Sequence, residues 1–137
     1  MAWFARSTFR RRGISVVDEP LSGRHVLVVE DEIMVLMLIE EMLADLGCAS
    51  VTAVATVDRA LEAIDAKVFD VAMLDVNLNG TKSYPVADAL AARGVPFLFA
   101  TGYSDHGAKD GYPDRPVLTK PFQFQKLVDG LARLLPS

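Results

Sequence analysis

The sequence has little cysteine and no long apolar run. Cys48 is the single cysteine among 137 residues, so no internal disulfide can form, and we expect a reducing, cytoplasmic location. The longest uninterrupted apolar run, Ile33–Ile39, has seven residues. Because a bilayer crossing needs about 20 residues, we expect no membrane insertion. The N-terminus lacks an apolar run that leads to a small-residue cleavage site, which excludes a secretory signal.

Basic charge is concentrated at the N-terminus. Residues 1–13 contain four arginines and no acid, whereas the whole chain has a formal net charge of −4. The remainder is therefore acidic, which argues against nucleic-acid binding. We assign residues 1–22 to a basic extension and 23–137 to one folded domain. The extension is either a solvated tail or a contact for phosphate or lipid headgroups.

Apolar runs alternate with segments of helical periodicity along the rest of the chain. Strands are expected at 24–30, 49–55, 68–76, 95–100 and 115–119, and helices at 31–47, 56–67, 84–94 and 123–135. This alternation predicts an α/β fold with a doubly wound, five-stranded parallel sheet in the flavodoxin-like order 2-1-3-4-5. Three glycines and a proline between Thr101 and Arg115 predict that a fourth helix there is short or disordered.

Polar side chains lie at or just after the carboxyl ends of four predicted strands. These side chains belong to Glu30, Asp31, Asp75, Thr101 and Lys120. Because ligands of such sheets bind at the carboxyl ends of the strands, we expect the five side chains to converge. Each of them alone has a structural explanation as a cap, turn or surface residue. Together, the three carboxylates repel one another unless a cation binds, and all-oxygen ligands suit Mg²⁺.

The predicted cluster has the parts needed for phosphoryl transfer. Glu30 and Asp31 are candidate metal ligands, and Asp75 on the central strand is the better nucleophile, because a carboxylate can accept a phosphoryl group as an aspartyl-phosphate. Mg²⁺ and Lys120 would neutralise the charge on the transferring group, and Thr101 would donate a hydrogen bond to it.

Four motifs, in this order and spacing, resemble the receiver domains of response regulators, the CheY-like phosphoacceptors of two-component signalling. They are VLVVEDE, MLDVNLNG, FATG and LTKPF, and the resemblance covers about residues 24–135. It implies that Asp75 is the phosphoacceptor and a metal ligand. It also implies that Asp31 ligates Mg²⁺ directly, Glu30 ligates it through water, and Asn77 ligates it with its backbone carbonyl.

The same resemblance assigns the remaining site residues. Thr101 would be the switch hydroxyl, Lys120 would pair with the phosphoryl group, and the peptide bond before Pro121 would be cis. Many receivers carry an aromatic residue at the position of Val117. The stretch PFLFATGY instead resembles the FATGUY subgroup, and we hypothesise that Tyr103 takes the signalling role of that aromatic residue. Alternatively, Tyr103 only packs the loop over the fifth strand.

The first predicted helix has two apolar faces. The face expected to contact the sheet contains Val35, Ile39, Met42, Leu43 and Leu46. The other face contains Ile33, Met34 and Met37 beside two glutamates, and exposed methionines make an adaptable docking surface. With Pro121 and Phe122 it forms the expected partner surface for a sensor histidine kinase or phosphotransfer protein. Alternatively, Trp3, Phe4 and Phe9 of the N-terminal extension cover it.

We therefore expect a stand-alone receiver that takes a phosphoryl group from phospho-histidine onto Asp75. With no output domain after the last helix, it would act as a relay, a phosphate sink or a switch for an unidentified downstream protein. It would be an enzyme only toward its own phosphorylation and dephosphorylation. The alternative is a degenerate receiver that binds partners without phosphorylation. A flavodoxin-like cofactor binder would need a phosphate cradle where the chain has acids, and a hydrolase would need a carboxylate where it has Asn77.

Overall fold

The computed structural model describes residues 20–102 and 112–136 of the chain. The sheet strands are β1 (His25–Val29), β2 (Ser50–Val54), β3 (Val71–Asp75), β6 (Phe97–Thr101) and β7 (Val117–Thr119). The helices are α1 (Ile33–Asp45), α2 (Val57–Ala66), α3 (Tyr84–Ala92) and α4 (Phe124–Leu134). A short hairpin, β4 (Asn77–Leu78) and β5 (Thr81–Lys82), lies between β3 and α3.

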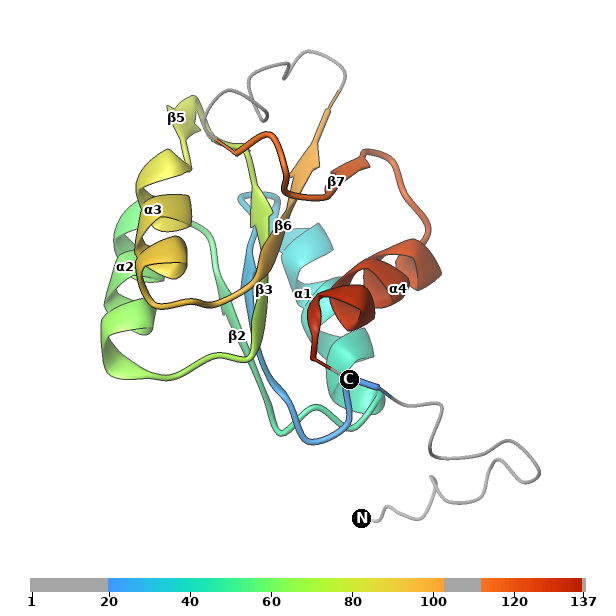
Figure 1. Cartoon of the computed structure of the whole chain (residues 1–137). Helices are drawn as coiled ribbons and strands as arrows, with labels where there is room; N and C mark the ends of the chain where they lie inside the picture. Colours follow the sequence, from blue (N-terminus) through green and yellow to red (C-terminus); the bar gives the residue numbers. More distant parts are fainter. Residues whose placement is uncertain (1–19, 103–111, 137) are drawn as a thin grey trace, which may run out of the picture.

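All pairs of neighbouring strands in the five-stranded sheet are parallel, and their order is β2-β1-β3-β6-β7 (Figure 1). The predicted fold class and strand order are confirmed. The predicted short or disordered helix falls mainly on residues 103–111, which lie outside the described residues. Of the helices in the described part of the chain, none is long and apolar enough to cross a bilayer.

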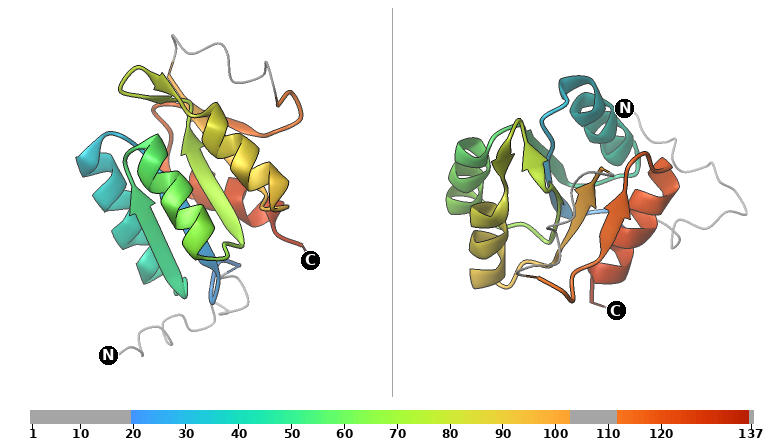
Figure 2. Two further views of the ribbon diagram at one scale, coloured as in Figure 1. Left: turned by 90° about the vertical axis from the view of Figure 1, so that its left-hand side faces the viewer. Right: turned by 90° about the horizontal axis from the view of Figure 1, so that it is seen from above.

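The continuous apolar runs form strands because helices cover both faces of the sheet. In β1, Leu27 and Val29 pack into one core cluster, whereas Val26 and Val28 pack into the other. The first cluster lies under α2 and α3, and the second lies under α1 and α4. Figure 2 shows the two helix pairs on opposite sides of the sheet.

Local chemistry positions the helices. The Thr56 side chain accepts a hydrogen bond from the backbone N–H of Arg59 (3.2 Å), which caps the N-terminus of α2. Leu36, Ile39 and Leu43 form the buried stripe of α1. Val35 and Met42, which we expected to face the sheet, are only half-buried because they line a groove between α1 and the start of α4.

Core contacts begin before the first strand. Leu21 is 1% exposed and packs with the α1–α4 cluster, two residues before the expected start of the folded domain at Gly23. Residues 1–19 of the predicted basic extension lie outside the described residues. Its extent and role therefore stay a prediction.

Candidate functional site

The carboxyl ends of β1, β3, β6 and β7 lie at one edge of the sheet. Val29 in β1 is the register partner of Leu74 in β3, so the next residues along these neighbouring strands, Glu30 and Asp75, lie side by side. Asp75 in turn pairs with Ala100, and Thr101 pairs with Thr119, the residue before Lys120. The sheet register alone thus brings the predicted site residues to one place.

Lys120 joins two buried carboxylates. Its Nζ donates a hydrogen bond to Asp75 Oδ2 at 2.8 Å and forms an ion pair with Glu30 Oε1 at 2.9 Å. Glu32 Oε1 is 3.7 Å from the same nitrogen. Glu30 is 0% and Asp75 3% exposed, so this ammonium offsets much of the charge that the fold has removed from water.

Burial sets the electrostatics of these groups. Desolvation raises the pKa of Asp75 and of Glu30, although Lys120 acts against the shift in both cases. Burial alone would lower the pKa of Lys120, but its hydrogen bond to Asp75 and its pairing with Glu30 outweigh that effect and raise the pKa. The ammonium therefore stays protonated at neutral pH.

Asp31 completes an acidic cluster. Glu30, Asp31 and Asp75 each place a carboxylate oxygen within 4.8 Å of the others. Three carboxylates at this spacing repel one another, and the single ammonium of Lys120 cannot neutralise all three. The donor set is all oxygen, and Asp31 is only half-buried, which leaves an open side. The residues present therefore fit a hard divalent cation such as Mg²⁺.

Backbone N–H groups orient each carboxylate of the cluster. Glu32 N–H donates to Glu30 Oε2 (3.0 Å), and Asn77 N–H donates to Asp75 Oδ1 (3.2 Å). Asn79 N–H, at the tip of the β4–β5 hairpin, donates to Asp31 Oδ2 (3.0 Å). Glu32 and Asn79 were not predicted from the sequence as neighbours of the site. The dipeptide Asn79-Gly80 was an available signal, since it favours a tight hairpin.

Thr101 and Lys120 are linked through the backbone. Lys120 N–H donates to the Thr101 carbonyl at 2.7 Å, and the Lys120–Pro121 peptide bond is cis, as the resemblance implied. Thr101 is 7% exposed, and its hydroxyl donates to the Gly102 carbonyl at 3.3 Å. Val117 packs against the α2–α3 cluster. Tyr103 lies outside the described residues, so its switch role is untested.

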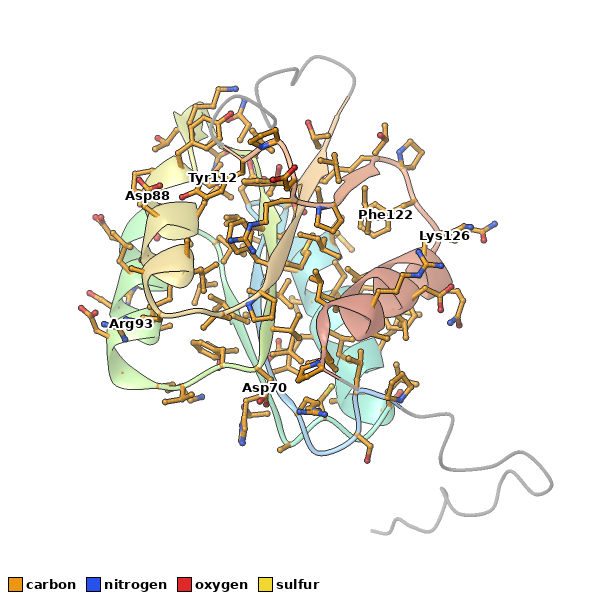
Figure 3. The ribbon with its side chains drawn as sticks, in the orientation of Figure 1. Asp70, Asp88, Arg93, Tyr112, Phe122 and Lys126 are labelled. Atoms are coloured by element: carbon orange, nitrogen blue, oxygen red, sulfur yellow. The ribbon has the colours of Figure 1, made fainter. Side chains whose placement is uncertain are left out.

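The outer face of α1 is apolar and exposed. Ile33, Met34, Met37 and Leu38 are 55%, 84%, 61% and 54% exposed, respectively. Beside them, a groove of about 600 Å³ separates α1 from the β7–α4 connection, where Figure 3 labels Phe122. The groove is lined by residues that include Val35, Leu38, Met42, Lys120, Pro121 and Phe122. It therefore runs from the apolar face to Lys120, which pairs with Glu30 and Asp75 of the acidic cluster.

Comparisons with known proteins agree with this geometry. Residues 26–132 match the family described as the response regulator receiver domain. SdrG from Sphingomonas melonis Fr1 is 44% identical, with a TM-score of 0.69 over 84% of this chain and 97% of that one. The BeF₃-activated conformation of SdrG, whose source is given as Pseudomonas melonis Fr1, is 45% identical, with a TM-score of 0.68 over 83% and 98%.

A third solved structure contains the expected metal. The receiver domain of the sensor histidine kinase PA1611 from Pseudomonas aeruginosa, with magnesium coordinated in its active-site cleft, is 28% identical. Its TM-score is 0.72, over 85% of this chain and 100% of that one. No curated protein sequence matches this chain. The family match spans most of the chain and the relatives reproduce the fold; the chain therefore belongs to the response regulator receiver domain family of two-component signalling.

Proposed function

We propose that this receiver accepts a phosphoryl group from a phospho-histidine donor onto Asp75. The carrying observation is the position of Asp75: its carboxylate is nearly buried at the end of the central strand, between Lys120 and the acidic pair Glu30 and Asp31. An Asp75 carboxylate oxygen attacks phosphorus, the P–N bond to the donor imidazole breaks, and the imidazole keeps the electron pair. The product is an aspartyl-phosphate.

The neighbouring residues have separate tasks in this proposal. Glu30, Asp31, Asp75 and the carbonyl of Asn77 would hold Mg²⁺, which when bound supplies positive charge opposite the phosphoryl oxygens. Lys120 holds its ammonium beside the Asp75 carboxylate and would pair with a phosphoryl oxygen once one arrives. The Thr101 hydroxyl would turn from Gly102 toward the same group, and that movement is the proposed switch.

Asn77 supports a long-lived phosphoryl group. Its side-chain oxygen accepts the Gly80 N–H at 2.6 Å, so it is engaged in the hairpin turn. An amide, moreover, cannot remove a proton from an attacking water molecule. We therefore infer slow self-catalysed dephosphorylation. This autocatalysis is the only enzymatic activity that we assign to the chain.

The exposed face of α1 supports a role in partner binding. Ile33, Met34 and Met37 form an apolar surface next to the acidic cluster, and Pro121 and Phe122 border the adjoining groove. We infer that a histidine kinase or phosphotransfer protein docks there, since docking at this edge brings its phospho-histidine near Asp75. The complete set of acids, hydroxyl and lysine supports phosphorylation over the alternative of a degenerate receiver. Relay, phosphate sink and partner-binding switch are the three roles that this function allows.

Intact-mass measurement tests the proposal. The protein is incubated with acetyl phosphate, with and without Mg²⁺, and wild type is compared with Asp75→Asn. We expect one phosphoryl group on the wild type in Mg²⁺ and none on the variant. An Asp70→Asn variant serves as the matched control and should be phosphorylated normally, because Asp70 is a half-buried aspartate just before β3, at the opposite end of that strand from Asp75. An adduct that persists in Asp75→Asn would contradict the assignment.

A further inference from the structure

The β4–β5 hairpin has a fixed conformation next to the acidic cluster. Its two strands pair antiparallel, and Leu78 anchors it in the core at 4% exposure. The turn residues Asn79 and Gly80 have φ angles of 55° and 89°, and two consecutive positive φ angles are what a type I′ hairpin turn requires. The bond from Gly80 N–H to the Asn77 side chain closes the turn.

The tip of this hairpin contacts the cluster at one atom. Asn79 N–H donates to Asp31 Oδ2 across 48 positions of sequence. Among the residues that the structure describes, this is the one hydrogen bond that the Asp31 carboxylate accepts. Asp31 lies between β1 and α1, on the half-buried side of the cluster. Its side chain would otherwise rotate toward water, away from the carboxylates of Glu30 and Asp75.

We propose that the Asn79-Gly80 turn is a positioning device, which holds the Asp31 carboxylate in the metal-binding arrangement through the Asn79 backbone N–H. The inference rests on the proposed Mg²⁺ site and adds a residue pair to it. A backbone donor in a closed turn is suited to this task because it has no side-chain torsion through which to turn away. Such partners of metal ligands commonly change metal affinity by about 10- to 100-fold when they are removed.

The turn geometry makes the proposal testable without changing any acid. Asn79→Val introduces a β-branched residue, for which a φ of 55° is strongly disfavoured, so the tip must rearrange. Asn79→Gly keeps both the N–H and the freedom to adopt positive φ. Thr81→Val is the matched control, because it places the same side chain at an exposed strand position of the same hairpin.

Mg²⁺ affinity is measured by calorimetry without a phosphodonor, after thermal melts show that the variants are folded. We expect the dissociation constant to rise about tenfold in Asn79→Val and to stay within about twofold of wild type in Asn79→Gly and Thr81→Val. Unchanged affinity in Asn79→Val, or an equal loss in Thr81→Val, would overturn the inference. A wild type that binds Mg²⁺ but is not phosphorylated would contradict the proposed function alone.

Amide hydrogen exchange gives a second test that needs no altered turn. In the wild-type protein the Asn79 amide should be protected from exchange, and Asp31→Ala should accelerate its exchange. The Gly80 amide, which donates a hydrogen bond to the Asn77 side chain, should stay protected in both proteins. If Asn79→Val fails to fold, this comparison decides the question. Equal exchange of the Asn79 amide in wild type and Asp31→Ala would show that the contact positions nothing.

Discussion

Replacing Lys120 by methionine should destabilise the metal-free protein strongly. Methionine retains most of the aliphatic stem but removes the ammonium that lies 2.8 Å from Asp75 and 2.9 Å from Glu30. Both carboxylates are nearly or fully buried, and breaking a buried pair by removing one partner costs about 3–5 kcal/mol. We expect a loss of about 3 kcal/mol, at the low end of this range, because Lys120 is 23% exposed and water can enter in its place.

Urea denaturation in Mg²⁺-free buffer measures this loss. A change of about 3 kcal/mol corresponds to a fall of roughly 10 °C in the melting temperature of a domain of this size. Lys126→Met is the control, since Lys126 is an exposed residue on α4 (Figure 3) and its change should stay within about 0.5 kcal/mol. Asp75→Asn should stabilise the Lys120→Met variant more than it stabilises wild type, because the Asp75 charge has no ammonium beside it once Lys120 is replaced.

Two results would refute this reasoning. If Lys120→Met unfolds at the same urea concentration as wild type, the ammonium does not compensate the buried carboxylates. If Asp75→Asn stabilises the Lys120→Met variant no more than it stabilises wild type, the loss comes from packing of the lysine stem and not from charge. Saturating Mg²⁺ should reduce the difference in the free energy of unfolding between Lys120→Met and wild type, because a bound cation replaces some of the missing positive charge.

Three smaller changes test other parts of the structure. Asp75→Asn should stabilise the metal-free protein at pH 7, because folding raises the pKa of Asp75 and its ionised form therefore opposes folding. The gain measured by urea titration should shrink as the pH falls through that pKa, because the wild-type carboxyl then becomes protonated. Ser83→Ala should raise the free energy of unfolding by about 1 kcal/mol, because the buried Ser83 hydroxyl has no hydrogen-bond partner among the described residues; an equal or lower value would indicate a bound water. Tyr112→Phe removes the hydrogen bond to Asp88, toward which Tyr112 points in Figure 3. It should lower the free energy of unfolding by only about 0.5 kcal/mol in thermal melts, because the pair lies at the surface. A decrease as large as that of Lys120→Met would contradict a surface role.

The sheet and the convergence of the site were predictable because both depend on strong local signals. Continuous apolar runs such as Val26–Val29 and Val71–Leu74 leave no polar face for solvent, so they required helices on both sides of the sheet. Parallel pairing then places every strand end at one edge, and the positions of Glu30, Asp75 and Lys120 follow from register alone. No side-chain geometry was needed for this step.

The contacts within the site were less predictable. Two-residue strands such as β4 and β5 carry too few residues for an alternating pattern, so only the Asn79-Gly80 dipeptide indicated the hairpin. The hydrogen bond from Asn79 to Asp31 spans two loops whose relative position depends on the whole fold. The same holds for the 3.7 Å approach of Glu32 to Lys120, because Glu32 is the residue before α1 and Lys120 follows the last strand of the sheet.

The buried stripe of α1 shows a further limit. Helical periodicity identifies an apolar face, but α1 is apolar on most of its surface, so the pattern did not fix which stripe meets the sheet. The structure selects Leu36, Ile39 and Leu43 and leaves Val35 and Met42 facing the groove toward α4. Tertiary packing against a second helix decided that rotation. The switch role of Tyr103 stays a prediction.

Chemical mapping of the phosphorylated residue tests the central claim most directly. The wild-type protein is phosphorylated with acetyl phosphate in Mg²⁺, reduced with borohydride, which converts an aspartyl-phosphate to homoserine, and then digested and sequenced by tandem mass spectrometry. We predict homoserine at position 75, the buried carboxylate beside Lys120, and at no other aspartate. Homoserine at Asp31 or elsewhere, or an unmodified Asp75 in protein that carries a phosphoryl group, would contradict the account.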